Sequence, residues 1–301
     1  MLKSICLGRN KYDINIVVDK MPAEGTTTEV FNKIGCGGGT ASNVAVSLGK
    51  WGIGCAICGV LGNDVYANKI KEEFDKVHLD TRYLEQSYNN DTPLSTIIIN
   101  KETNNFSIYN LSDKFIAIKK MDYDFTPDLT VVDGYDSVAA KKLLERFPNS
   151  TSVLCADIVT KEVYDLCHKS KYVICSSKFA EMAVGIKYDP NNMQSLAEIY
   201  QALKKKNLNT EFIIYLNEKG VLYCVNNQIK ISPMIQMEVQ DRQGGYDAFC
   251  AGFSYEIVVD KDLEKAVKYG CISASLNSRS VGTRLSIPTL EEIKKIYEQN
   301  Y

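Results

Sequence analysis

Short apolar runs alternate with segments of helical spacing through the middle of the chain. Three runs have the length and residue types of buried strands, at 129–134, 152–158 and 172–176. The segments between them, 137–146 and 161–168, carry apolar residues at helical intervals. This alternation predicts parallel strands joined by right-handed helical crossovers. We therefore expect an α/β fold, with a doubly wound, mostly parallel sheet flanked by helices.

The flanking parts of the chain extend this pattern. Further helices are expected up to Trp51 and at 68–77, 179–184, 192–205 and 262–281. Further strands are expected at 4–8, 211–216 and 221–225. A second group of strand-like segments lies at 14–18, 26–34, 96–100 and 106–110. The first two of these precede the first helix, so we interpret them as a hairpin excursion from the main sheet.

A cluster of glycines at 35–39 leads into a helix of small residues. One interpretation is a flexible loop or a tight strand-to-helix turn, and the other is a place at which a ligand contacts bare backbone. Asn43 would then supply a donor and an acceptor to that ligand, and its alternative role is a hydrogen bond at the helix start. Thr40 or Ser42 is expected to cap the helix.

A second glycine pair, Gly244 and Gly245, lies between an expected strand at 235–239 and a helix that Asp247 opens. The apolar positions of this helix recur every fourth residue, at Phe249, Phe253 and Ile257. The free N–H groups of such a turn, at the positive end of the helix dipole, form an anion site. Asp247 is either a helix cap or a general base that takes a proton from an acceptor hydroxyl.

Composition limits the partners and the compartment. The 301 residues carry a net charge of -2, which argues against a nucleic-acid or anionic-membrane partner. No apolar run is long enough to span a bilayer, and residues 1–20 lack a secretory pattern, so a cytoplasmic protein is expected. Cys55 and Cys58 have C-x-x-C spacing but lie in a strand-like segment without a histidine cluster, which argues against a zinc site.

Two separate stretches resemble the signatures of the ribokinase/PfkB carbohydrate-kinase family. The first has every fixed position of that signature, at Gly38, Gly39, Ala41, Asn43, Ala45, Gly52 and Gly62. The second matches at Asp241, Gly244, Asp247, Ala251 and Gly252. It departs from the family pattern where Arg242 replaces Thr, Gly245 replaces Ala and Tyr246 replaces a second glycine. The resemblance extends over nearly the whole chain.

The resemblance implies a single ribokinase-like domain over 1–301, with a small β lid formed by about 14–34 and 96–110. It also implies that the sugar is bound by Asp13, Gly38, Gly39 and Asn43. Carboxylate and amide groups fit this role because each hydrogen-bonds hydroxyl groups, and unpaired buried groups penalise a wrong ligand. The alternative role of Asp13 is that of a turn residue.

The resemblance further implies ATP as the phosphoryl donor. Its cofactor site would comprise Asn217, Lys219, Gly220, Gly244 and Asn277, although Lys219 is equally well explained as a hairpin residue. Glu181 would help to hold Mg²⁺ through water, and Asp157 falls near the same sheet edge. Many family members use a monovalent cation beside the second signature, where Arg242 would supply a permanent positive charge.

The expected function is an ATP-dependent sugar kinase. Asp247 would be the base, and the backbone N–H groups of Gly244, Gly245 and Tyr246 would stabilise the transferred phosphoryl group. One alternative is a sugar- or nucleotide-binding protein in which Tyr246 has blocked catalysis. Another is a nucleoside kinase of the same fold. Exposed edges of the lid strands also indicate a homodimer.

Overall fold

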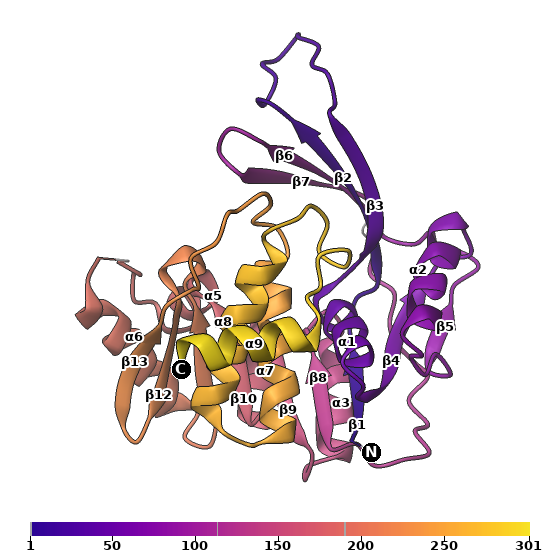
Figure 1. Cartoon of the computed structure of the whole chain (residues 1–301). Helices are drawn as coiled ribbons and strands as arrows, with labels where there is room; N and C mark the ends of the chain where they lie inside the picture. Colours follow the sequence, from indigo (N-terminus) through magenta and orange to yellow (C-terminus); the bar gives the residue numbers. More distant parts are fainter. Residues whose placement is uncertain (1, 113, 190) are drawn as a thin grey trace.

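The structure is a computed structural model that describes residues 2–112, 114–189 and 191–301 (Figure 1). The strands are Lys3–Leu7 (β1), Lys11–Val18 (β2), Asn32–Gly38 (β3), Gly54–Leu61 (β4), Leu84–Gln86 (β5), Leu94–Asn100 (β6), Asn105–Ser112 (β7), Leu129–Val132 (β8), Thr151–Ala156 (β9), Tyr172–Ser176 (β10), Glu211–Tyr215 (β11), Val221–Val225 (β12) and Gln228–Ser232 (β13). The α-helices are Thr40–Lys50 (α1), Val65–Lys76 (α2), Ser137–Arg146 (α3), Lys161–Leu166 (α4), Ser177–Val184 (α5), Met193–Lys206 (α6), Gly245–Val259 (α7), Leu263–Asn277 (α8) and Leu290–Asn300 (α9). Short 3₁₀ turns cover Cys167–Lys169 and Asn217–Lys219.

The main sheet confirms the expected fold class. Within the described residues it has nine strands in the order β13-β12-β11-β10-β9-β8-β1-β4-β5. The pairs from β11 through β5 are parallel, and only the hairpin strands β12 and β13 are antiparallel. The strand order reverses direction at β1, which makes the sheet doubly wound. Ligands in such sheets bind beyond the carboxyl ends of the strands.

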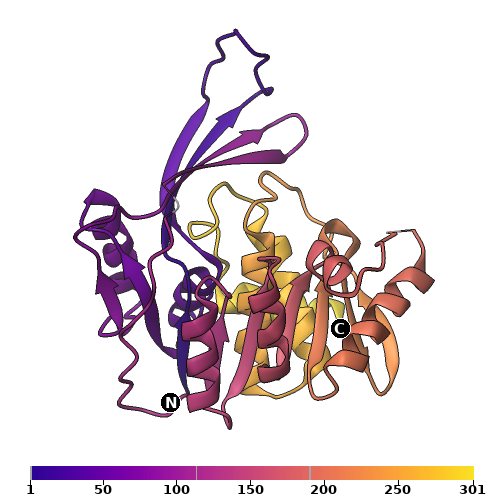
Figure 2. The same ribbon diagram turned by 180° about the vertical axis from the view of Figure 1, so that it is seen from behind.

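Two apolar cores cover the two faces of this sheet, because successive side chains of a strand point to opposite faces. In β1, for example, Cys6 belongs to one core, whereas Ile5 and Leu7 belong to the other. The first core is completed by α1, α7 and α8, and the second by α3 to α6. Figures 1 and 2 show these layers from opposite sides. The chemistry expected at α1 and α7 therefore lies on one face, at one end of the sheet.

The lid is a separate sheet of four strands, ordered β3-β2-β6-β7. It projects beyond the carboxyl end of β1 (Figure 1). The register pairs Ile14 with Gly35 in β3 and with Thr96 in β6, so the excursion predicted from sequence joins the second pair of predicted strands. Its bounds differ from the expected ones, because residues 26–31 form no strand and β3 begins at Asn32.

The glycine cluster 35–39 is not a flexible loop, and the tight strand-to-helix turn is confined to its last residue. Gly35 to Gly38 form the second half of β3, and only Gly39 turns the chain. The glycines are needed for space. A Cβ on Gly35 would lie 2.5 Å from the Tyr12 hydroxyl, and one on Gly38 would lie 2.1 Å from Asp13 Oδ2. Side chains from other segments thus occupy the room that the missing side chains leave.

Three local expectations were wrong. Residues 235–239 form no strand, because Ile235 N donates to the side chain of Ser275 and the segment follows Pro233, which has no N–H to donate. Helix α8 ends at Asn277, short of residue 281, since the chain turns there towards Gly282. Neither expected side chain caps α1, whose N-cap is Gly39 without a side-chain bond.

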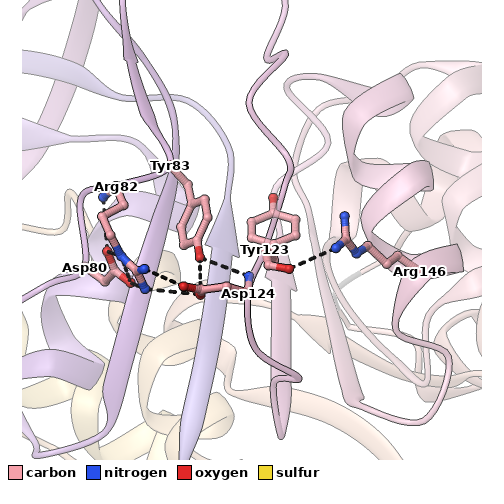
Figure 3. A network of polar contacts seen from close by, with 6 residues as sticks. All are labelled: Asp80, Arg82, Tyr83, Tyr123, Asp124 and Arg146. Carbon is pink, nitrogen blue, oxygen red and sulfur yellow. Dashed lines mark hydrogen bonds and ion pairs between the residues drawn. The ribbon is translucent and has the colours of Figure 1, made fainter.

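A network of polar contacts fixes the segment that returns from the lid to β8 (Figure 3). Asp124 accepts hydrogen bonds from Arg82 Nη1 and from the Tyr83 hydroxyl, both at 2.6 Å. Arg146 of α3 donates through Nη2 to the carbonyl oxygen of Tyr123 at 2.9 Å. These contacts fasten the segment that leads from the lid to β8 onto the main domain.

Candidate active site

The turn before α7 requires glycine on two grounds. Gly244 has a φ of 86°, and a Cβ there would lie 2.3 Å from Thr283 Oγ1. The N–H groups of residues 245–247 have no partner inside the helix, and no described residue accepts a hydrogen bond from them. Three free donors at the positive end of a helix dipole form a site suited to an anion.

Asp247 lies in this first turn, and its carboxylate reaches across to α1. Oδ1 accepts from the Thr40 hydroxyl at 2.8 Å, and Oδ2 accepts from Asn43 Nδ2 at 2.6 Å. No side chain caps α7, so the alternative that Asp247 is a helix cap is wrong. Burial raises the pKa of Asp247, whereas the two hydrogen bonds and the nearby Lys11 charge oppose that rise. The result is a held carboxylate whose affinity for a proton is increased.

Asp13 lies on β2 at the base of the lid and is almost fully buried. Its Oδ1 pairs with Lys11 Nζ at 2.9 Å. Gly38 leaves room for the other carboxylate oxygen. Position 39 requires glycine, because its φ is 99° and a Cβ there would lie 2.0 Å from the carbonyl oxygen of Arg9. The structure thus brings together Asp13, Gly38 and Gly39, three of the residues that were expected to bind the sugar. Lys11 connects them to Asp247, since its charge acts on both carboxylates.

Asn43 is placed differently from a side chain that is free to bind a ligand. It is 3% exposed, its Nδ2 donates to Asp247, and its Oδ1 accepts from Arg284 Nε at 2.8 Å. Both polar groups of the amide are therefore bonded within the protein. One N–H of Nδ2 is left without a partner among the described residues.

A buried carboxylate supports the turn between β3 and α1. Asp133, at the end of β8, accepts from the backbone N–H groups of Arg9, Ala41 and Tyr135. Burial raises the pKa of Asp133 to about 6 even though these three donors lower it. Asp133 therefore fixes the ends of β1 and α1 on either side of the lid connection.

The expected nucleotide residues lie at the other side of α7. Asn217 and Gly220 adopt left-handed conformations, with φ values of 55° and 102°, in the loop between β11 and β12. Lys219 Nζ donates to Asn191 Oδ1 at 3.1 Å. Arg242 Nη1 lies 3.7 Å from Glu218, which connects this loop to the turn before α7.

Asn277 is buried, unlike Asn217 and Lys219 of the loop between β11 and β12. It is 1% exposed and donates through Nδ2 to the carbonyl oxygen of Thr283 at 2.9 Å. Its contact therefore holds the 283 segment that packs against Gly244. Any effect of Asn277 on a nucleotide would pass through that segment.

The side chain of Tyr246 packs against residues of the main sheet. Its hydroxyl donates to the carbonyl oxygen of Ile174 at 2.8 Å, and its ring packs edge-on against Tyr215 with 5.7 Å between centroids. Burial raises the pKa of Tyr246 well above its usual value, so the hydroxyl stays protonated and keeps donating. The side chain thus anchors α7 to β10, and its backbone N–H remains among the free donors.

The two expected acidic residues lie beyond the ends of β9 and β10. Asp157 is exposed, and Glu181 accepts through Oε2 from the N–H of Tyr188 at 3.2 Å. In the part of the chain that is described, no three His, Cys, Asp or Glu side chains converge as a metal site. Two carboxylates still fit Mg²⁺ held through water, since this ion keeps several waters and prefers oxygen donors.

The buried carboxylate of Asp241 stabilises the turn that precedes α7. It is 1% exposed and accepts from the N–H groups of Gln243 at 2.9 Å and Gly282 at 3.2 Å. Burial raises the pKa of Asp241 to about 6. The adjacent Arg242 forms its ion pair with Glu218, in the loop between β11 and β12.

Sequence reasoning missed three residues that shape the site. Lys11 had a usable signal, because strand residues two apart lie on one face and Asp13 was already a candidate. Thr40 was seen only as a cap. Arg284 had no local signal, since its bond to Asn43 spans 241 positions of sequence.

Comparison with known proteins defines the class to which this fold and site belong. A sequence model described as pfkB family carbohydrate kinase matches residues 1–290. The chain therefore belongs to the pfkB family of carbohydrate kinases, and it is a phosphotransferase with an alcohol group as acceptor.

Individual relatives are distant but cover the full length. The deoxyribokinase of Salmonella typhi is 23% identical over 309 residues, with 98% of both chains covered. The nucleoside kinase of Methanocaldococcus jannaschii is 20% identical over 315 residues, covering 100% of this chain and 98% of that protein. The structure of Arabidopsis thaliana ribokinase complexed with ribose and ATP superposes with a TM-score of 0.82 at 18% identity, with 98% of both chains covered. Among the described residues, no helix has the length and apolar character needed to cross a bilayer.

Proposed function

We propose that this protein transfers the γ-phosphoryl group of ATP to a hydroxyl of a sugar or sugar-like alcohol. The acceptor oxygen attacks the γ-phosphorus, the bond from that phosphorus to the β–γ bridging oxygen breaks, and ADP leaves. The acceptor proton passes to the Asp247 carboxylate. A base with a raised pKa suits this step, because it binds the acceptor proton more firmly than a solvent-exposed carboxylate does.

The observation that carries this proposal is the position of Asp247. Its carboxylate is held at two points by α1, on the same side as Asp13 and Lys11, while the N–H groups of its own helical turn are free. A residue that only stabilised α7 would bond to those N–H groups. A base needs to face the acceptor while the free donors face the phosphoryl group.

The acceptor side is assigned to Asp13, Gly38, Gly39 and the remaining N–H of Asn43. The carboxylate of Asp13 accepts hydroxyl hydrogen bonds, and the glycines allow the acceptor to approach bare backbone. Lys11 adds a positive charge beside them.

The phosphoryl and nucleotide side is assigned to the turn at Gly244, Gly245 and Tyr246 and to the loop at Asn217, Lys219 and Gly220. Asn277 would support it through Thr283. Asp157 and Glu181 would hold Mg²⁺ through water, and the bound ion would neutralise charge on the ATP oxygens. Tyr246 does not argue against transfer, because its ring packs on Tyr215 and its hydroxyl bonds to β10.

We further propose a single domain over 1–301 in which the four-stranded sheet closes over the acceptor and excludes water from the phosphoryl group. Among the described residues the outer strand β7 pairs on one side only, and exposed apolar side chains lie on it, including Ile108, Tyr109 and Leu111. Edge pairing between two lids would form a homodimer. The ten cysteines are unpaired thiols, which fits a reducing compartment such as the cytoplasm.

The experiment that tests the function is ADP release from ATP and Mg²⁺ across ketoses, aldoses, sugar acids, amino-sugar conjugates and nucleosides. Asp247→Asn is expected to lower turnover by about 100-fold or more, the scale of a positioned base, with little change in melting temperature. Asp165→Asn, which neutralises an exposed carboxylate on α4, is the matched control and should retain full turnover.

The same panel decides between the alternatives. Turnover with nucleosides alone would make this a nucleoside kinase, an activity that the Methanocaldococcus jannaschii relative carries in its name. Silence with every acceptor, while ATP or a sugar still raises the melting temperature, would favour a binding protein without catalysis. In that case Tyr246→Gly is the next variant to assay.

A further inference from the structure

Arg284 lies at the centre of a buried cluster that joins four segments of the chain. Its side chain is almost fully enclosed between the lid strand β3 and helices α1 and α2, and the guanidinium lies 5.2 Å from the centroid of the Phe74 ring. Nη1 pairs with Glu73 Oε2 at 2.8 Å, and Nη2 donates to the carbonyl oxygen of Gly38 at 3.2 Å and to the Ser42 hydroxyl. Such a cluster is costly to desolvate, so its geometry is informative.

The lid strand is built to accept this side chain. A Cβ on Gly37 would lie 1.8 Å from Arg284 Nη1 and 2.6 Å from Glu73 Oε2. The N–H of Gly37 donates to both oxygens of Glu73 at 3.0 Å. The ion pair thus binds the backbone of β3 on two sides, through Gly37 N–H and Gly38 C=O.

The remaining guanidinium nitrogen sets the orientation of Asn43. Arginine has donors only, so the amide can face Nε only with its oxygen, which it does at 2.8 Å. The amide nitrogen must then point the other way, where it donates to Asp247 Oδ2 at 2.6 Å. A side chain with both a donor and an acceptor at position 284 would allow the Asn43 amide to exchange the positions of its oxygen and nitrogen.

We infer that Arg284 is a positioning residue for the phosphoryl transfer, which acts through Asn43 to hold the Asp247 carboxylate and connects it to the base of the lid. This inference deepens the proposed function and rests on Asp247 as the base. Arg284 itself is buried beneath the acceptor side. Its effect is therefore to fix the direction and the ionisation of Asp247.

The orientation of the Asn43 amide affects the pKa of Asp247. When Asn43 donates to Asp247, it lowers the pKa of that carboxyl against the rise caused by burial. Without Arg284 the amide can rotate when Asp247 is protonated, so that its oxygen accepts the carboxyl proton. This stabilises the protonated form and raises the pKa of Asp247. The other charged or titratable groups that act on Asp247 come from β2, β8, β9, β11 and α7, and all stay unchanged: Lys11, Asp133, Asp157, Tyr215 and Cys250.

The test uses the full chain with Arg284→Met, and Arg279→Met as the matched control. Arg279 lies in the same segment but is half exposed and pairs with Glu292. In Arg284→Met the acid limb of kcat/KM should move up by about one pH unit, the scale of one charged hydrogen bond. Arg279→Met should keep the wild-type pH profile even where it lowers the melting temperature.

A second measurement does not depend on turnover. The Asp247 carboxyl is titrated by ¹³C NMR in protein labelled at aspartate, with its resonance identified by its absence in Asp247→Asn. The titration midpoint should rise in Arg284→Met. If Arg284→Met does not fold, Glu73→Gln with Arg284→Gln replaces it, because this pair leaves no buried charge unpaired.

The outcomes are separable. A folded Arg284 variant with the wild-type pH profile and titration midpoint would overturn the inference, since a merely structural role changes stability and neither of these. If the wild-type protein shows no turnover with any acceptor, the proposed function fails, while the NMR titration still decides whether Arg284 controls Asp247. A rise of the midpoint together with the acid limb would support both.

Discussion

Helices α1 and α7 begin in the same way and end up with different roles. Each follows a glycine with positive φ, 99° at Gly39 and 86° at Gly244, and neither has a side-chain cap. At α1 a carboxylate of the protein fills the anion position, because Asp133 Oδ2 accepts from Ala41 N at 3.3 Å. At α7 the first-turn donors meet no acceptor in the ranges that the structure describes. A glycine turn before a helix is therefore only a potential anion site, and what faces it decides its use.

The largest effect is expected when the turn before α7 is altered at Gly244. In Gly244→Ala the new Cβ would meet Thr283, and the positive φ would be strained, so the free donors would lose their common direction. Turnover should fall by about 1,000-fold, the upper range for loss of preorganised donors. Steady-state kinetics measures it, with circular dichroism to verify the fold.

Gly185 supplies the matched control for that variant. It also has a positive φ, 73°, but a Cβ there has nothing within 4 Å. Gly185→Ala should lower the free energy of unfolding by about 1 kcal/mol, which is the conformational cost alone, and leave turnover intact. Equal losses of turnover in the two variants would mean that the α7 turn has no special role.

A smaller effect concerns the carboxylate that holds the α7 turn. The pKa of Asp241 is raised to about 6 in the folded protein, against about 3.9 in an unfolded chain. Its contribution to stability is then fully present below about 3.9 and is lost as the pH rises through 6. The free energy of unfolding of the wild type, relative to Asp241→Asn, should increase by up to about 3 kcal/mol from pH 7 to pH 4.

Urea unfolding of both proteins at each pH measures this difference. Taking the difference between the two proteins cancels the titration of groups that they share. A difference that stayed constant over the range would show that the carboxyl of Asp241 titrates normally.

The smallest expected effect concerns monovalent cations. Arg242 carries a permanent charge beside Asp241 and forms an ion pair with Glu218 in the loop between β11 and β12. Turnover should therefore change by less than about twofold when potassium replaces sodium. Assays at constant ionic strength measure this. A steep rise with potassium would mean that a cation site exists beside the turn despite the arginine.

Much of the fold was predictable because it depends on local pattern. The strand–helix alternation identified the main sheet, and the bounds of α3, β10 and β12 agree with the expected ones. The prediction failed at 35–38 and at 235–239. In both places distant groups decide the conformation, through Arg284 and Asp13 packing on the glycines and through Ser275 binding Ile235 N.

The sequence alone determined the family signatures, the α/β alternation and Asp247 as a residue with two alternative roles. Only the tertiary structure excluded the role of helix cap, because the partners of the carboxylate, Thr40 and Asn43, lie 207 and 204 positions away. The same holds for Arg284, which no local pattern marks. Periodicity reports which residues face a core, whereas the direction of a carboxylate depends on which donors the folded chain brings to it.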